Sequence, residues 1–248
     1  MSKDVLGAEE VAEYLGVGLI TVYRWCREGR LPCLKIGKYW RIRREALEDF
    51  LRRGERPTTL VGQLQTFLRV PDNVIGIAQD LDLLHHLDAA FFQVGEARGG
   101  LLLKFYGGED EPADELRARL THNGLDVERL EKVGCLLMRA EQDPLNGQEG
   151  ELRQIFEVEA GSGRTIWASF DWAKPIDLDT TLHQQHALAK LVDNRQLVVK
   201  TVALEQAVSD WPPATVRQAQ MLHSGMIWLS HAGVALTRVA PLSPDAQG

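Results

Sequence analysis

Apolar positions recur with helical spacing twice in the first thirty residues. The inward-facing residues of these two short helices are Val11, Ala12, Leu15, Val22, Trp25 and Cys26. Gly16 permits the tight turn between them. After Gly29 the apolar positions alternate instead, which predicts two short strands that pivot about Gly37 and Lys38, and helical spacing returns between Ala46 and Leu51. The pattern predicts two helices, a hairpin and a closing helix.

The outward positions of the second helix and the hairpin are rich in cations. The candidate DNA-binding residues are Thr21, Tyr23, Arg24, Arg27, Lys35, Lys38, Tyr39, Arg41 and Arg43. Between Thr21 and Arg56 there are 11 Lys and Arg against five Asp and Glu, although the whole chain has a net charge of −7. We expect the helix to enter the major groove of double-stranded DNA, with Arg24 at base edges and the hairpin cations at phosphates.

These residues carry a family resemblance. Residues 6–51 resemble the winged helix-turn-helix of the MerR superfamily, above all its excisionase-like branch, through the motifs Leu15-Gly16-Val17, Thr21-Val22-Tyr23-Arg24 and Leu31-Pro32 followed by Ile36-Gly37 and Trp40-Arg41-Ile42. The resemblance implies DNA binding. Two departures stand out: Gly18 replaces the usual capping side chain, and Leu19 and Ile20 replace polar residues, so that contact with thymine methyl groups would substitute for base hydrogen bonds.

Helical and strand patterns alternate from residue 77 onward. Helices are expected at 82–96, 114–123, 149–160, 178–194 and 213–223, and strands at 101–106, 135–138, 165–170, 197–204, 226–229 and 234–239. This alternation predicts an α/β sandwich with a mostly parallel central sheet and an antiparallel edge pair. The expected domains are a winged helix-turn-helix at 1–56, a linker at 57–74, an α/β domain at 75–242 and a tail at 243–248.

The order of these elements gives the second domain a resemblance of its own. Residues 75–240 are similar to the MEDS sensory domain of DcmR-type regulators, which is related to the RecA-like ATPase core. The features that carry it are the helix 82–96 with its Gly99-Gly100 stop, the strand to Tyr106, Leu116 with Gly124-Leu125-Asp126-Val127, the strand to Asp171-Trp172, and Thr201 to Leu204. The resemblance implies signal reception in transcription control.

A RecA-like ATPase needs a glycine-rich phosphate loop after its first strand. The segment after Tyr106, residues 107–111, is acidic and would repel a triphosphate, and residues 161–165 are more simply a turn from a helix into a strand. We therefore expect a domain without a phosphate-binding loop, without catalytic residues and without a cofactor.

Histidines and strand ends offer two weaker hypotheses. His183 and His186 lie one helical turn apart and His85-His86 lie on another helix, but no spacing fixes the further ligands that a metal needs, so no metal is expected. Asp171 and Trp172 directly follow a strand, and ligands of parallel α/β domains bind at such carboxyl ends. Together with Tyr106, they form the candidate ligand site.

Three cysteines, Cys26, Cys33 and Cys135, cannot all pair, and a reducing setting is favoured. Cys26 is interpreted as a small core residue, with a redox pair between Cys26 and Cys33 as the alternative. No apolar run approaches the length of a membrane span and no secretory segment is evident. The protein is expected to be cytoplasmic and nucleoid-associated, with no membrane partner.

The sequence thus favours a sequence-specific transcription regulator, whose α/β domain senses a small-molecule or protein effector or mediates oligomerisation. The alternatives are an architectural or recombination factor, a DNA-tethered scaffold and an enzyme delivered to DNA. A homo-oligomer is expected, because one short helix reads too few base pairs. The expected contacts are Leu60, Leu64 and Phe67, or Val216, Met221 and Leu222.

Overall fold

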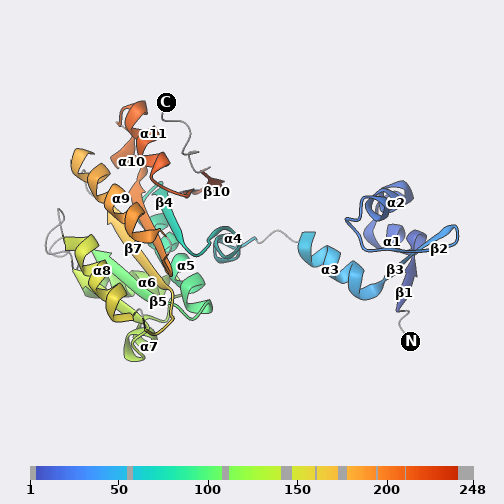
Figure 1. The fold of residues 1–248 in the computed structure, drawn as a ribbon, viewed down its shortest axis with the longest axis horizontal. Helices are drawn as coiled ribbons and strands as arrows, with labels where there is room; N and C mark the ends of the chain where they lie inside the picture. The colour runs from blue at the N-terminus through green and yellow to red at the C-terminus, as the bar shows by residue number, and fades with distance from the viewer. Residues whose placement is uncertain are drawn as a thin grey trace. The chain divides into compact units, whose positions relative to one another are not determined.

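The chain folds into two compact units, residues 1–58 and 59–248. The computed structural model describes residues 4–54, 58–107, 112–140, 147–159, 161–172, 178–193, 195–209 and 211–239 (Figure 1). None of the helices in these ranges is long and apolar enough to cross a bilayer.

The first unit is a winged helix-turn-helix. Its elements are β1 (Val5–Gly7), α1 (Ala8–Leu15), α2 (Leu19–Arg27), β2 (Leu34–Ile36), β3 (Tyr39–Arg43) and α3 (Arg44–Gly54). The three strands form an antiparallel sheet in the order β1-β3-β2. Gly16 ends α1 with a left-handed backbone, at a φ of 63°, and Gly37 turns the hairpin at a φ of 61°. The predicted helices, hairpin and closing helix are all present, and β1 is an addition.

The core of this unit is formed by Ala8, Val11, Ala12, Val22, Cys26, Leu31, Ile42 and Leu47. The ring centre of Trp25 on α2 lies 5.0 Å from that of Phe50 on α3, so the closing helix stabilises α2 through this aromatic contact. Since α1, α2, β3 and α3 all contribute, the unit has a hydrophobic core of its own.

The second unit alternates helices and strands. Its elements are α4 (Leu60–Phe67), β4 (Asp72–Ala78), α5 (Leu81–Ala97), β5 (Leu101–Tyr106), α6 (Ala113–His122), α7 (Val127–Lys132), β6 (Leu136–Ala140), α8 (Gly147–Glu159), β7 (Ile166–Trp172), α9 (Leu178–Val192), β8 (Leu197–Leu204), α10 (Glu205–Val208), α11 (Pro213–Met221), β9 (Gly225–Ser230) and β10 (Gly233–Arg238). The expected elements from residue 82 onward are confirmed, with α7 and α10 in addition.

The strands form one seven-stranded sheet in the order β10-β9-β4-β8-β7-β5-β6. All neighbours are parallel except β10, which runs antiparallel to β9. The predicted fold class, a mixed α/β domain with a mostly parallel sheet and an antiparallel edge pair, is confirmed.

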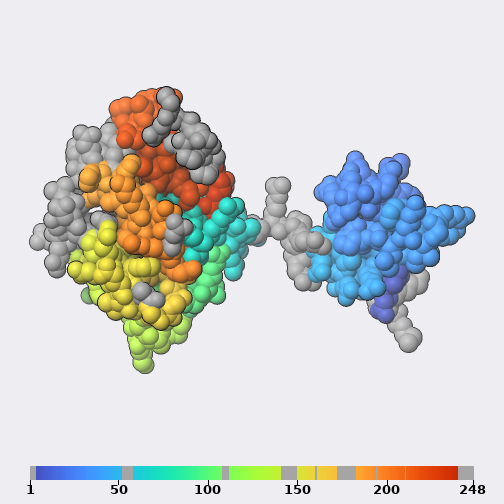
Figure 2. Space-filling view, in the orientation of Figure 1, coloured from blue at the N-terminus to red at the C-terminus, as the bar shows by residue number. Residues whose placement is uncertain are grey.

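Helices cover both faces of this sheet. On one face, α4, α5, α6 and α7 bury a core that includes Leu87, Phe91 and Trp167. On the other, α8 and α9 pack over Phe105 and Phe170, whose rings stack 4.5 Å apart. In the view of Figure 1, α8 and α9 lie on the near side of the sheet, and their yellow and orange atoms face the viewer in Figure 2.

Gly95 and Gly100 lie so close to the Trp167 ring of β7 that neither position has room for a side chain. A Cβ on Gly95 would lie 2.7 Å from Cγ of Trp167, and one on Gly100 would also collide with that indole ring. Gly99, at a φ of 68°, supplies the turn out of the helix. The sequence predicts only a helix stop at Gly99-Gly100, and the structure adds that Gly95 and Gly100 make room for the buried Trp167.

The segment 57–74, interpreted as a linker, is structured over most of its length. Thr59 caps α4 by accepting a hydrogen bond from the Gly62 amide at 3.2 Å, and Leu64 is completely buried against the core. β4 begins at Asp72 and occupies the middle of the sheet. The sequence predicts an oligomer contact through Leu60, Leu64 and Phe67. They do not form a free apolar face, because all three side chains pack against the core of the second unit.

The first strand of the second unit is therefore β4, not the strand that ends at Tyr106. The turn that follows it is Gln79-Asp80, which contains no glycine. Asp80 caps α5, since its Oδ1 accepts from the Leu83 amide at 2.9 Å, and this hydrogen bond lowers the pKa of Asp80. The position where a phosphate loop would meet a helix N-terminus thus carries a carboxylate of the chain itself.

Candidate functional site

α2 presents a mixed outward surface. Arg24 and Arg27 are exposed, and Arg27 also donates to the Tyr23 carbonyl over 3.4 Å. Thr21 and Tyr23 are less accessible, since both are half-buried, and the Tyr23 hydroxyl donates to Oε1 of Glu9 on α1 at 3.4 Å. Of the predicted contacts on this helix, the two arginines are therefore the most accessible side chains.

The start of α2 contains the residues that depart from the family pattern, Gly18, Leu19 and Ile20. Gly18 gives no side-chain cap, and Ile20 is 79% exposed. Leu19, in contrast, packs partly against the core of the unit. Of the two apolar residues, only Ile20 is thus fully presented for contact with a thymine methyl group.

The hairpin formed by β2 and β3, residues 34–43, is the wing. The Nζ atoms of Lys35 and Lys38 lie 5.7 and 5.3 Å from the ring centres of Trp40 and Tyr39, and the guanidinium of Arg41 lies 5.4 Å from the ring of Tyr39. Cation–π contacts of this kind hold the charges in place without neutralising them. Arg43, at the end of β3, lies 3.8 Å from the Glu45 carboxylate, and this exposed pair offsets part of its charge.

A disulfide joins α2 to the segment that enters the wing. Cys26 in the last turn of α2 pairs with Cys33, whose Cα lies 5.4 Å away. Cys26 is 8% exposed and belongs to the core, as expected, but its sulfur is bonded to Cys33 rather than being a lone thiol. The free cysteine is Cys135.

The second unit contains a buried ion network formed by Asp88, Lys104, Ser169, Asp171 and Lys200. Lys104, Ser169 and Lys200 lie side by side in register on β5, β7 and β8. Asp88 on α5 faces all three: Nζ of Lys104 donates to its Oδ2 at 2.6 Å, and Oγ of Ser169 and Nζ of Lys200 both donate to its Oδ1, the former at 2.6 Å. Lys104 also donates to Oδ2 of Asp171.

This network lies in the interior. The side chains of Asp88, Lys104 and Lys200 are 0% exposed and that of Asp171 is 6% exposed. Burial favours the neutral form of Asp88, but the two ammonium groups outweigh it and lower the pKa of its carboxyl group. Burial, reinforced by the charge of Asp88, raises the pKa of Asp171, and burial lowers that of Lys200.

Sequence patterns identify one member of this network and miss the others. Asp171 is predicted as a ligand residue at a strand end, and the structure gives its Oδ2 to Lys104. The available signal was the presence of Lys104 and Lys200 inside otherwise apolar strands, and of Asp88 inside an apolar helix. Tyr106, half-buried at the end of β5, lies on the same face, whereas the side chain of Trp172 lies outside the described residues.

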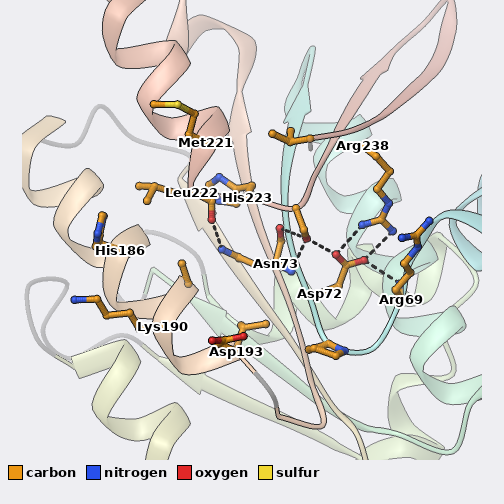
Figure 3. A pocket seen from close by; sticks show the side chains of 15 residues that line it. Arg69, Asp72, Asn73, His186, Lys190, Asp193, Met221, Leu222, His223 and Arg238 are labelled. Atoms are coloured by element: carbon orange, nitrogen blue, oxygen red, sulfur yellow. Dashed lines mark hydrogen bonds and ion pairs between the residues drawn. The ribbon is translucent and has the colours of Figure 1, made fainter. Parts of the chain in front are cut away.

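A cavity of about 800 Å³ lies at the amino ends of β4 and β9, beside α9 and α11 (Figure 3). Most polar groups named on its floor are paired: Arg238 binds both oxygens of Asp72 at 2.8 and 2.9 Å, and Nδ2 of Asn73 donates to the Leu222 carbonyl at 2.9 Å, whereas Oδ1 of Asn73 has no partner among the described residues. Lys190 of α9 and Asp193, the residue after this helix, also line it. This is the opposite edge of the sheet from Tyr106 and Asp171.

Known proteins support the assignment of the first unit. Residues 5–55 match the helix-turn-helix domain family. The match supports an N-terminal helix-turn-helix domain with DNA as its partner, and it covers only this unit. A search of curated proteins found no match.

Among solved structures, the chain has a remote neighbour. A KaiC-like protein of the hyperthermophilic archaeon Pyrococcus horikoshii OT3 is similar with 14% sequence identity and a TM-score of 0.47, over 69% of this chain and 81% of that one. A likeness this remote carries no argument about activity or ligands.

The histidines are dispersed. His183 and His186 are exposed on α9, whereas His85 is buried on α5. Within the described ranges, no three His, Cys, Asp or Glu side chains are grouped in a way that would hold a metal ion. Residues 161–165 form the turn between α8 and β7, as predicted.

His223, two residues after the end of α11, is buried, and both of its ring nitrogens have polar partners. Its Nδ1 lies 2.6 Å from the Ala219 carbonyl, to which it donates, and its Nε2 lies 2.7 Å from the Gln185 side chain. Burial lowers the pKa of His223 to about 4. The neutral ring is therefore the form that the fold stabilises.

We expect this histidine to make the second unit acid-sensitive. Between pH 6.5 and about 4 the unfolded chain binds a proton at His223 that the folded chain does not, so the free energy of unfolding decreases as pH falls through this window. Replacing His223 by Gln should reduce the pH slope by up to about 1.4 kcal/mol per pH unit in urea unfolding. The exposed His183→Gln is the matched control, and an unchanged slope in His223→Gln would refute this assignment.

Proposed function

We propose that the chain is a sequence-specific DNA-binding transcription regulator. The observation that carries the proposal is the juxtaposition, in a helix-turn-helix unit, of a helix with two exposed arginines and a wing whose cations lie on aromatic rings. Arg24 would contact base edges in the major groove, and Lys35, Lys38 and Arg41 would contact phosphates. A nucleoid location follows from such binding.

For the second unit we propose a regulatory, non-catalytic role, either as a sensor of an effector or as the means of oligomerisation. The glycine-free turn at Gln79-Asp80 and the capped start of α5 support the absence of nucleotide chemistry. The resemblance to MEDS sensory domains supports signal reception and remains a prediction.

Oligomerisation is supported by the size of the DNA contact. One short helix reads too few base pairs to discriminate sites in a genome, so two copies are needed. With the α4 face used inside the unit, α11 is the remaining candidate contact, and its Met221 is 53% exposed.

Selection of duplexes from a random pool by the full-length chain tests this proposal. We expect enrichment of two half-sites, whose spacing is fixed by the geometry of the dimer. Measurement of the native mass of the complex checks the stoichiometry. An enriched single half-site bound by one copy would contradict the oligomer, and a pool without enrichment would contradict sequence-specific binding.

A further inference from the structure

Among the described residues, one carboxylate oxygen of the buried ion network has no hydrogen-bond donor. Both oxygens of Asp88 accept hydrogen bonds, from Lys104 on one side and from Lys200 and Ser169 on the other. Asp171 accepts from Lys104 through Oδ2 only. Its Oδ1 is buried and has no hydrogen-bond partner in the described part of the chain.

Asp171 lies near the carboxyl end of β7, at the carboxyl edge of the sheet. Lys104 and Ser169 are paired in the parallel register of β5 and β7, so that Tyr106 and Asp171, two residues further along each strand, lie beside each other on the same face. The side chain of Asp171 is 6% exposed, whereas its neighbours in the network have no exposure. Leu83, Tyr106 and Leu204 are partly buried at the border of the adjoining core.

The two carboxylates of the network differ in one respect. Asp88 lies between two ammonium groups, those of Lys104 and Lys200. Within the described residues, Asp171 has the ammonium group of Lys104 on one oxygen and no donor on the other. A buried acceptor without a donor is unfavourable, and a charged donor is the group that compensates a carboxylate best.

We propose that the second unit binds a small molecule at this edge through an ammonium group that donates to Oδ1 of Asp171. The bound cation would give Asp171 a second ammonium donor, as Lys200 gives one to Asp88. The apolar part of the ligand would contact Tyr106 and Leu83. This inference rests on the proposed sensory function and names the chemical class of the effector, an organic amine.

The test uses the full-length chain without DNA and three probes of matched size: n-butylammonium, n-butanol and butanoate. We expect ligand-detected NMR titrations at millimolar concentration to show saturable binding of n-butylammonium only. Asp171→Asn keeps the shape and removes the charge, and it should weaken this binding about tenfold or more. Lys132→Ala, which replaces an exposed lysine on α7, is the control and should leave this binding unchanged.

Tyr106→Ala provides a second variant at the rim, in case Asp171→Asn does not fold, and it should also weaken binding. Equal binding of n-butanol, no binding of n-butylammonium, or binding that Asp171→Asn and Tyr106→Ala leave intact would overturn the proposal. Because no DNA is present, failure of this test leaves the DNA-binding function intact, and a loss of DNA binding in a separate titration would not remove the amine site.

Discussion

Replacing Asp88 by Asn is expected to destabilise the second unit by about 3–5 kcal/mol. Asp88 is the shared partner of Lys104 and Lys200, and its loss leaves two buried ammonium groups with only Asp171 to balance them. A loss of that size is a large part of the stability of an ordinary domain. Urea unfolding followed by tryptophan fluorescence, to which the buried Trp167 contributes, measures it.

Two further variants show whether charge is the cause. Ser169→Ala removes a hydrogen bond to Asp88 but no charge, and it should cost only about 1 kcal/mol. The quadruple variant Asp88→Leu, Lys104→Met, Lys200→Met, Asp171→Asn removes all four charges, and it should recover most of the stability lost in Asp88→Asn. If Asp88→Asn unfolds within about 1 kcal/mol of the parent chain, the electrostatic account of this network is wrong.

The second large effect concerns DNA recognition. Arg24→Ala should weaken binding to the preferred duplex by about 1–3 kcal/mol and reduce discrimination between sequences, because an exposed arginine on α2 is placed to read a base. Lys38→Ala should weaken all duplexes alike and reduce the salt slope by about 1, because the wing lysine contacts phosphate. Fluorescence anisotropy with the preferred and a scrambled duplex separates the two effects.

Lys132→Ala, an exposed lysine on α7 of the second unit, serves as the matched control and should change neither quantity. Equal losses on both duplexes for Arg24→Ala and Lys38→Ala would remove the base-reading role of Arg24 while leaving a contact with the DNA backbone.

The first unit was predictable because its signals are local. Helical spacing, Gly16 at the turn and Gly37 at the hairpin tip each determine the conformation of a few neighbouring residues. β1 has only three residues and is held by pairing with β3 across the unit, from Val5 to Arg43, so its short sequence carries little strand signal of its own.

β4 was not predicted, because it too depends on partners that are distant in the sequence. It follows Pro71 and begins with Asp72 and Asn73, two residue types that are rare in strands. The structure places partners on both: Arg238 binds Asp72, and Leu222 accepts from Asn73. These partners lie 166 and 149 residues away in the chain, so the local sequence around β4 does not predict them.

The ion network shows the same limit at the candidate site. Lys104 and Asp88 are 16 residues apart, Lys104 and Asp171 are 67 apart, and Lys200 and Asp88 are 112 apart. A lysine inside an apolar strand signals that a partner must exist, because an unpaired buried charge is too costly. Which residue supplies it depends on the order β8-β7-β5 in the sheet, and that order is set by the whole fold.

Titration of the full-length chain with the selected duplex and with a scrambled duplex, over a series of salt concentrations, tests sequence-specific DNA binding most directly. We expect the selected duplex to bind at least about 10³-fold more tightly, and the logarithm of its affinity to fall linearly with that of the salt concentration, with a slope of roughly −5. Equal affinity for both duplexes, or no binding at low salt, would contradict the assignment of this chain as a sequence-specific DNA-binding regulator.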